Sequence, residues 1–338
     1  MAAQLRIGIL GAGGLGSVIA GWLAESGVAV TLLARPAQVE AIRARGLEIR
    51  GIRGERCVRR NLEAHASADE VQGPLDYLIV AVKARDTESA LAGLGGLGDR
   101  IGAALSLQNA LGKDDVLAAR FGRERTLGAA TTESGTQTGP GQVQHVGTAP
   151  TAFYFGELDG APSGRVGALV DAFNKAGFGA QPAADIRHVE WEKLLQIASI
   201  CAFSVSALGT LPGGSVAEAF SVREAAEHYV AIAKELLAVY RGLGYEPRDF
   251  FAPYSRFREL ERESTEQAVE ATRALGRRML DAGVIGKPSL HVDLMRGRPT
   301  EVEHCLGPFL AEAERLGVAV PTARACWRII RTLEQMLA

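Results

Sequence analysis

The amino-acid sequence predicts an α/β fold in its first half and an all-helical second half. Two observations carry this prediction. Up to about residue 184, short runs rich in β-branched residues alternate with segments of helical period, which indicates strands covered by helices. From residue 185 the strand signal disappears and helical periods remain. Since 338 residues are enough for two domains, we expect domains at 1–184 and 185–338.

Short apolar runs in the first half predict five strands of a sheet. They lie at residues 5–10, 28–33, 77–82, 103–107 and 126–131. Between the first two, apolar residues recur at helical spacing from Leu15 to Leu23, which indicates a helix that packs on the sheet. Strands that alternate with helices imply parallel pairing. Around residues 139–158 the pattern changes, and we expect a hairpin of antiparallel strands that closes one sheet edge.

Helical periods continue through the second half. Apolar faces at residues 222–240, 302–313 and 326–337 predict three helices. The segment 256–280 combines helical spacing with many charges, so one of its faces is expected to be solvated. After Lys193, 24 residues pass without a charged side chain. Polar residues and a Gly-Pro break interrupt this run, so it predicts a buried helix and not a membrane span.

Composition argues against several classes of partner. A formal net charge of -2 without a basic run argues against nucleic acid. The N-terminal residues lack the basic and apolar regions of a signal peptide. The four cysteines show no paired spacing of a zinc motif or disulfide framework, so we expect no metal and a reducing, cytoplasmic compartment. A homodimer through the helical half remains an open alternative to a monomer.

A glycine-rich turn follows the first predicted strand and opens the first predicted helix. Its glycines are Gly11, Gly13, Gly14 and Gly16. In this pattern the first glycine permits a tight turn, the next lets the backbone approach a pyrophosphate, and the last lets helix and strand pack closely. The helix N-terminus then offers N–H groups to the anion. We therefore predict a Rossmann-like dinucleotide-binding domain; the alternative is a glycine-rich turn without a ligand.

The end of the second predicted strand distinguishes NAD from NADP. An NAD site usually has an acidic residue there, which binds the ribose hydroxyls. This chain has Ala34 followed by Arg35, so a guanidinium is offered in place of a carboxylate. A guanidinium suits a 2′-phosphate, which favours NADP. The alternative is that Arg35 is an ordinary surface arginine.

Five segments in order resemble the ketopantoate reductase family, the NADPH-dependent 2-dehydropantoate 2-reductases. They are GAGGLG with the strand-end Arg35, VAVKA, SLQNALG, WEKL and KPSLHVDLMRGRPTEVE. The last is long and specific, since it is similar to the family's P-S-M-L-Q-D-x-x-x-G-R-x-T-E-I-D signature. The matching positions are Lys83, Asn109, Lys193, Ser289, Asp293 and Glu301. The resemblance covers nearly the whole chain.

The resemblance implies a role for each matching residue. Lys83 would lie beside the cofactor, and Asn109 would contact both nicotinamide and substrate. Ser289 would bind substrate. Lys193 would be the catalytic lysine that protonates the developing alkoxide, together with Glu301. The implied reaction is the NADPH-dependent reduction of a 2-oxo acid to the 2-hydroxy acid.

Three positions depart from the family pattern. Ile197 and Cys201 stand four and eight residues after Lys193, where the family usually has asparagines. Ala110 stands where the family usually has glycine. Because residues four and eight apart project from one face of a helix, Ile197 and Cys201 are expected to line the substrate pocket. We therefore expect weak activity on ketopantoate and better activity on a 2-oxo compound with a bulkier apolar or aromatic tail.

Two other functions remain open. The first is a dehydrogenase of the same two-domain plan that acts on another, more apolar ketone or hydroxy acid. The second is a nucleotide-binding sensor without turnover. His145 and His188 are expected to be structural, with His188 as proton donor a minor alternative. The acidic and histidine residues between 291 and 304 do not predict a metal site, because the resemblance assigns Glu301 to the substrate.

Overall fold

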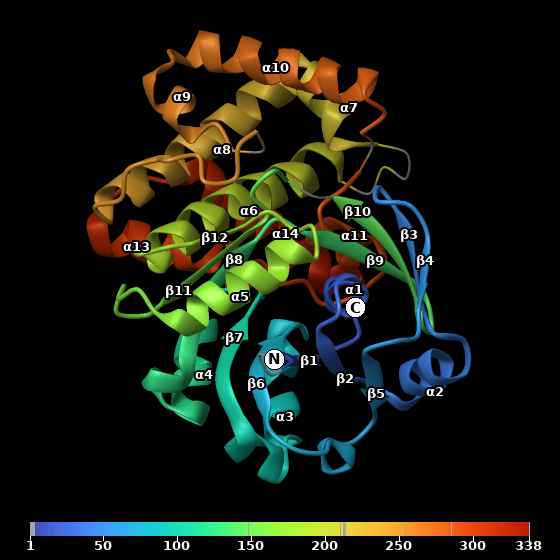
Figure 1. Cartoon of the computed structure of the whole chain (residues 1–338). Coiled ribbons are helices and arrows are strands. Elements are labelled where there is room, and N and C mark those ends of the chain that lie inside the picture. The colour runs from blue at the N-terminus through green and yellow to red at the C-terminus, as the bar shows by residue number, and fades with distance from the viewer. Residues whose placement is uncertain are drawn as a thin grey trace. The chain divides into compact units, whose positions relative to one another are not determined.

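The computed structural model describes residues 4–147, 149–209, 211, 214–253, 255–284 and 286–337. The chain divides into two compact units, Met1–Glu190 and Trp191–Ala338. The division falls inside helix α6 (Ile186–Leu208), whereas the expected boundary after residue 184 precedes this helix. Each unit has its own set of elements, and Figure 1 follows them along the chain.

The first unit is built on a mostly parallel sheet. Within the described residues its strands run in the order β12-β11-β8-β7-β6-β1-β2-β5. They are β1 (Arg6–Leu10), β2 (Ala29–Leu33), β5 (Leu62–His65), β6 (Leu75–Val80), β7 (Ile101–Ser106), β8 (Thr126–Thr131), β11 (Phe153–Glu157) and β12 (Ala180–Pro182). Neighbours from β5 to β8 pair in parallel, and β11 runs antiparallel to β8. The predicted parallel α/β sheet is confirmed.

Helices and apolar side chains cover both faces of this sheet. The helices are α1 (Gly14–Glu25), α2 (Pro36–Arg45), α3 (Thr87–Ala92), α4 (Lys113–Phe121) and α5 (Gly164–Lys175), with 3-10 turns η1 (Ala68–Glu70), η2 (Ala84–Asp86), η3 (Gly95–Arg100) and η4 (Arg123–Arg125). Ile7 and Ile9 of β1 belong to one apolar core, while Leu10 belongs to the other. Strands buried on both faces read as continuous apolar runs, which is why β1 and β2 were predictable.

The segment predicted as a hairpin at 139–158 is divided between two sheets. A second sheet has the order β4-β3-β10-β9 and consists of β3 (Leu47–Gly51), β4 (Arg56–Val58), β9 (Ser134–Gly139) and β10 (Gln142–Gly147). In Figure 1 the green β9 and β10 lie beside the blue β3 and β4. β10 pairs with β9 across the turn, and β11 instead joins the main sheet. The prediction was wrong here because alternation identifies a strand but not its partner.

The second unit contains only helices among its described residues, as predicted. They are the part of α6 from Trp191 onward, α7 (Val216–Ser221), α8 (Arg223–Gly242), α9 (Phe257–Arg262), α10 (Thr265–Asp281), α11 (Ser289–Met295), α12 (Val302–Cys305), α13 (Gly307–Leu316) and α14 (Pro321–Leu337). The charged stretch 256–280 forms two helices because Ser264 caps the second, accepting from the Gln267 backbone N–H at 3.2 Å. None of the described helices combines the length and apolarity needed to cross a membrane.

Candidate functional site

The ends of four neighbouring parallel strands carry the residues predicted to bind a dinucleotide. Gly11 follows β1, Arg35 follows β2, Lys83 follows β6 and Asn109 follows β7. In the sheet order β7-β6-β1-β2, these strand ends lie next to one another. The chain order reverses between β1 and β6, which is where open α/β sheets bind their ligands.

The glycine loop is shaped by close contacts at three positions and by open space at the fourth. Gly11 has a φ of 116°, a backbone angle that residues with a side chain rarely adopt. A Cβ at Gly16 would lie 2.0 Å from the Gly11 carbonyl oxygen, and one at Gly14 would lie 1.9 Å from the Gly135 carbonyl oxygen of β9. A Cβ at Gly13 would meet no described atom within 4 Å. Packing therefore excludes side chains from three positions, whereas Gly13 faces open space.

Helix α1 begins at this loop without a side-chain cap. Gly13 is its N-cap residue, and its first turn contains no acidic side chain. The N–H groups of a first helical turn have no partner within the helix, and together with the helix dipole they favour an anion. The open space at Gly13 and the uncapped N-terminus both fit a pyrophosphate group.

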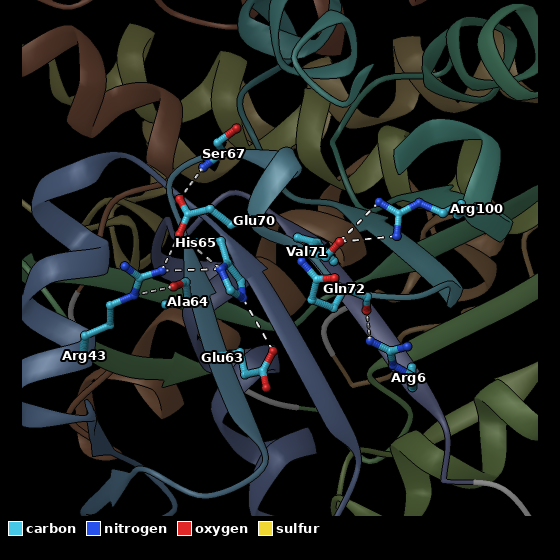
Figure 2. Close-up of polar contacts among 10 residues, drawn as sticks. All are labelled: Arg6, Arg43, Glu63, Ala64, His65, Ser67, Glu70, Val71, Gln72 and Arg100. Atoms are coloured by element: carbon cyan, nitrogen blue, oxygen red, sulfur yellow. Dashed lines mark hydrogen bonds and ion pairs between the residues drawn. The ribbon is translucent and has the colours of Figure 1, made fainter. Parts of the chain in front are cut away.

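Figure 2 shows that Arg43 of α2 is held by polar contacts with its neighbours, which is not so for Arg35. Arg43 of α2 donates to Glu70 at 2.6 Å and to the Ala64 carbonyl at 2.9 Å. Its guanidinium lowers the pKa of Glu70 to about 2. The Arg35 side chain is 89 % exposed and lies only within 3.9 Å of Asp86. Arg43 is therefore held by its neighbours, whereas the Arg35 guanidinium is exposed.

The loops after β6 and β7 are tied together by Gln108, which sequence reasoning did not single out. Its amide nitrogen donates to the Val82 carbonyl at 2.8 Å and to the Thr87 hydroxyl at 2.7 Å. Lys83 lies between these partners and is half-buried. Asn109 follows Gln108 with an exposed side chain that forms no hydrogen bond within the described part of the chain. Gln108 thus holds the Lys83 and Asn109 loops in a fixed relation.

A buried ion cluster anchors the far end of the Asn109 loop. Lys113, the first residue of α4, contacts Glu190 of α6 and lies 3.1 Å from Asp114. Glu190 also accepts from the Ala129 backbone N–H at 3.2 Å. Burial and then the neighbouring Asp114 raise the pKa of Glu190 to about 7, against the attraction of Lys113. The cluster fixes α4 to the start of α6 within the first unit.

Lys193 of α6 belongs to the second unit and is partly buried. Its ammonium donates to the Gln196 side chain at 3.2 Å and lies 5.5 Å from the ring centre of Phe251. Burial lowers the pKa of Lys193 to about 8, although Cys201 acts in the opposite direction. Among the described residues this ammonium forms no ion pair. It is therefore a cation in largely apolar surroundings, which is unusual for a lysine.

Two thiols connect the surroundings of Lys193 to those of Glu301. Cys201 and Cys305 are both buried, and a hydrogen bond between them raises the pKa of the Cys305 thiol. Glu301, the N-cap residue of α12, acts electrostatically on Cys305. Cys201 thus interacts with Lys193 on one side and with Cys305 on the other.

The other predicted residues of the second unit lie on α6 and α11. Ile197 is half-buried on α6, one turn beyond Lys193. Ser289 is exposed at the first residue of α11. Asp293 of the same helix lies 3.9 Å from Arg298. Among the described residues, no three His, Cys, Asp or Glu side chains gather as metal ligands would.

His145 is a buried part of the first unit. Its Nδ1 accepts from the indole N–H of Trp22 at 3.2 Å, and its Nε2 lies 2.6 Å from Glu133. His188 is also buried and lies 4.0 Å from Asp185. The Trp22 contact joins β10 to α1, and the Glu133 contact joins β10 to the segment between β8 and β9.

A mostly parallel sheet with a glycine loop at its switch point, followed by a helical unit with a partly buried lysine of lowered pKa, is typical of two-domain, dinucleotide-binding oxidoreductases. The family described as "Ketopantoate reductase PanE/ApbA" matches residues 7–160. Its companion, "Ketopantoate reductase PanE/ApbA C terminal", matches residues 185–334. The chain therefore belongs to the ketopantoate reductase family, whose members are oxidoreductases that act on CH–OH groups and use a nicotinamide dinucleotide.

Curated and solved relatives extend over nearly the whole chain. The 2-dehydropantoate 2-reductase of Halobacterium salinarum is 30% identical and that of Archaeoglobus fulgidus 28%, each covering 98% of this chain and 99% of the relative. The crystal structure of a PanE/ApbA family ketopantoate reductase from Ralstonia eutropha has a TM-score of 0.76 at 25% identity, covering 98% of this chain and 99% of that one. A D-mandelate dehydrogenase with NADH and anilino(oxo)acetate shares the fold at a TM-score of 0.75 and 21% identity, covering 98% and 99%.

Proposed function

We propose that this protein reduces a 2-oxo acid with an apolar or aromatic tail to the 2-hydroxy acid, with NADPH as reductant and Lys193 as proton donor. The observation that carries the proposal is the state of Lys193, whose pKa is lowered to about 8 beside Cys201 and Phe251. An ammonium with a pKa near the working pH is suited to donate a proton. Family membership supplies the reaction class.

The proposed chemistry assigns one step to each partner. When bound, the reduced nicotinamide dinucleotide supplies the hydride to the carbonyl carbon. The carbonyl π electrons move onto oxygen, and the Lys193 ammonium gives its proton to that oxygen. Lys193 is left neutral and regains a proton from water. Before the transfer, its positive charge stabilises the developing alkoxide in surroundings where few other charges compete.

The residues proposed to hold the dinucleotide all come from the four strand ends of the first unit. They are Gly11, Gly13, Gly14, Gly16, Arg35, Lys83 and Asn109. The exposed guanidinium of Arg35 supports NADPH, because it suits a 2′-phosphate. NADH is the alternative, since a D-mandelate dehydrogenase of this fold has NADH in its crystal structure.

Titration with both nucleotides tests the cofactor. NADPH is expected to bind more tightly than NADH, and Arg35→Ala to weaken NADPH binding about tenfold or more, the size expected for one charge-assisted contact. The same variant should leave NADH binding unchanged. Arg43→Ala is the matched control, because Arg43 is already bound to Glu70. Tighter binding of NADH by the native protein would contradict the proposal that Arg35 binds a 2′-phosphate.

The apolar tail is proposed from the side chains beyond Lys193. Ile197 and Cys201 offer no amide to a polar tail, and burying an unpaired polar group costs about 1–3 kcal/mol. That is roughly a tenfold to hundredfold loss in kcat/KM for each group. The D-mandelate dehydrogenase of the same fold has anilino(oxo)acetate, an aromatic 2-oxo compound, in its crystal structure. Glu301 and Ser289 of the second unit are proposed to contact the substrate's polar end.

Comparing kcat/KM for ketopantoate and for 2-oxo acids with phenyl or branched apolar tails tests this specificity. The native protein is expected to prefer the apolar series. The double variant Ile197→Asn/Cys201→Asn should move the preference toward ketopantoate. A much higher kcat/KM of the native protein for ketopantoate would contradict the proposal that Ile197 and Cys201 favour an apolar tail.

Ketopantoate reduction itself is the second candidate, favoured by the names of the Halobacterium and Archaeoglobus relatives. A nucleotide-binding sensor without turnover is the third. Any substrate-dependent oxidation of NADPH that Lys193→Met abolishes would exclude a sensor.

The sequence also left open whether the protein is a monomer or a homodimer. Light scattering measures this oligomeric state.

A further inference from the structure

Glu192 precedes Lys193 on α6, and its side chain is buried with 1 % of the residue exposed. Its carboxylate accepts two backbone hydrogen bonds of 2.7 Å, one from the N–H of Arg248 and one from that of Phe250. The hydroxyl of Tyr240 lies 3.5 Å away. Residues 248 and 250 belong to the connection between α8 and α9, so Glu192 joins this connection to α6, the helix that carries Lys193.

The backbone between these two donors is shaped to receive an anion. Asp249 has a φ of 54°, in the left-handed region. A left-handed residue between two N–H donors turns both toward the same side and forms an anion-binding nest. The Asp249 carboxylate accepts from the Phe257 N–H at 2.6 Å, at the start of α9. The connection is thus held at 248–250 by Glu192 and at α9 by Asp249.

The next residue links this anchor to Lys193. Phe251 is 1 % exposed, and its ring centre lies 5.5 Å from the Lys193 ammonium. An aromatic ring at this distance excludes water from one side of the cation and attracts it weakly through the ring face. Phe251 therefore covers one side of the Lys193 ammonium with an apolar ring.

We propose that Glu192 is a positioning residue for Lys193: its carboxylate fixes the 248–251 segment, which holds Phe251 over the ammonium. The proposal rests on Lys193 being the proton donor of the proposed function. A carboxylate buried without a cationic partner is costly, and two backbone donors satisfy it only while the segment keeps this conformation. Loss of the carboxylate should release the segment and admit water to Lys193.

Chemical labelling of Lys193 tests this without any substrate. Acetic anhydride acetylates the neutral amine, so the labelling of the Lys193 peptide against pH, read by mass spectrometry, reports its pKa. In Glu192→Gln and Phe251→Ala the pKa is expected to rise from about 8 toward the ordinary value of 10.5. Phe251→Leu, which keeps an apolar cover, should stay at or below the native value.

Glu235→Gln is the matched control. Its carboxylate on α8 also accepts two backbone hydrogen bonds, from Thr322 at 3.0 Å and Ala323 at 2.9 Å at the start of α14. This variant should leave the labelling of Lys193 unchanged. If Glu192→Gln does not fold, Glu192→Asp withdraws the carboxylate by one methylene and should also raise the pKa.

The outcomes separate the two proposals. Native labelling of Lys193 in a folded Glu192→Gln or Glu192→Asp overturns the positioning role, even if Phe251→Ala raises the pKa. A raised pKa in Glu192→Gln with an unchanged Glu235→Gln supports it. If the labelling shifts as expected but no 2-oxo acid is reduced by the native protein, the positioning role stands and the proposed reaction fails. Where reduction is measured, the pH profile of kcat should move with the labelling pKa.

Discussion

Burial destabilises the charged form of Lys193 and lowers its pKa to about 8. No carboxylate pairs with it among the described residues, so no neighbouring negative charge restores its ordinary pKa. Such a group can give up a proton when an alkoxide develops nearby and can recover it from water between turnovers. A surface lysine, with a pKa near 10.4, would donate less readily.

The pH dependence of reduction follows from this pKa. Since the protonated form is the donor, kcat should be constant below about pH 7 and fall about tenfold per pH unit above pH 8. Steady-state rates at saturating NADPH and 2-oxo acid measure this profile. Lys193→Met should lower kcat by about 100- to 10,000-fold, the usual contribution of a general acid, while NADPH binding is retained. A flat profile through pH 9.5 would contradict Lys193 as the donor.

Two neighbouring glycines are expected to respond differently to one added methyl group. Gly13→Ala places its Cβ in open space with a φ of -74°, so the protein should fold normally. The methyl group would occupy the room proposed for the pyrophosphate, so NADPH affinity should fall about tenfold or more. Gly14→Ala would bring its Cβ within 1.9 Å of the Gly135 carbonyl and should destabilise the fold itself. Calorimetric titration and thermal unfolding of both variants measure the difference.

At the scale of elements, the strand ends are held together by side chains that bridge loops. Gln108 joins the loops after β6 and β7, and the Lys113 cluster joins α4 to the start of α6. Gln108 directly precedes Asn109, and Lys113 follows it by four residues. Their effect is to present the Asn109 side chain from a loop that is fixed at both ends.

Breaking the buried Lys113–Glu190 pair should be costly. Glu190→Ala leaves the buried ammonium with only Asp114 nearby and is expected to lower the free energy of unfolding by about 3–5 kcal/mol. Glu157→Ala removes a more exposed ion pair with Arg165 and should cost about 1 kcal/mol or less from the pair itself. Urea unfolding of both variants gives the comparison. Equal losses would show that burial of the Lys113 cluster does not matter.

At the scale of the whole molecule, the chain consists of two compact units, and the proposed roles are divided between them. The first offers the proposed dinucleotide residues, and the second carries the lysine and its apolar surroundings. A ligand that binds only the folded state stabilises it by about 2.7 kcal/mol at a hundredfold excess over Kd. The region that gains protection therefore identifies the region that binds.

Amide hydrogen exchange of the intact protein tests this division. NADPH is expected to slow exchange in residues 11–17, 34–36, 81–87 and 107–112 of the first unit. Helix α10 (Thr265–Asp281), remote in sequence from every residue proposed to hold the dinucleotide, should exchange at the same rate with and without nucleotide. Protection confined to the second unit would contradict the assignment of the dinucleotide site.

The sequence by itself determined the α/β and helical halves, the strand–glycine–helix unit, and the segments that place the chain in its family. These features are local, because helical period, strand runs and turn glycines depend on residues close together in the chain. Strands β3, β4, β5, β9 and β12 were missed because they are short or partly exposed. The motifs also located Lys193 and Arg35 before any contact was known.

Only the tertiary structure decided how these residues are surrounded. The Lys193 ammonium lies 5.5 Å from the ring centre of Phe251, and Glu192 accepts hydrogen bonds from the backbone of Arg248 and Phe250, all more than 50 residues away. The split of 139–158 between two sheets likewise depends on β3 and β8, distant partners that alternation cannot specify. Desolvation, ion pairing and strand pairing are set by what folding brings together, so a linear pattern can name the residue but not its environment.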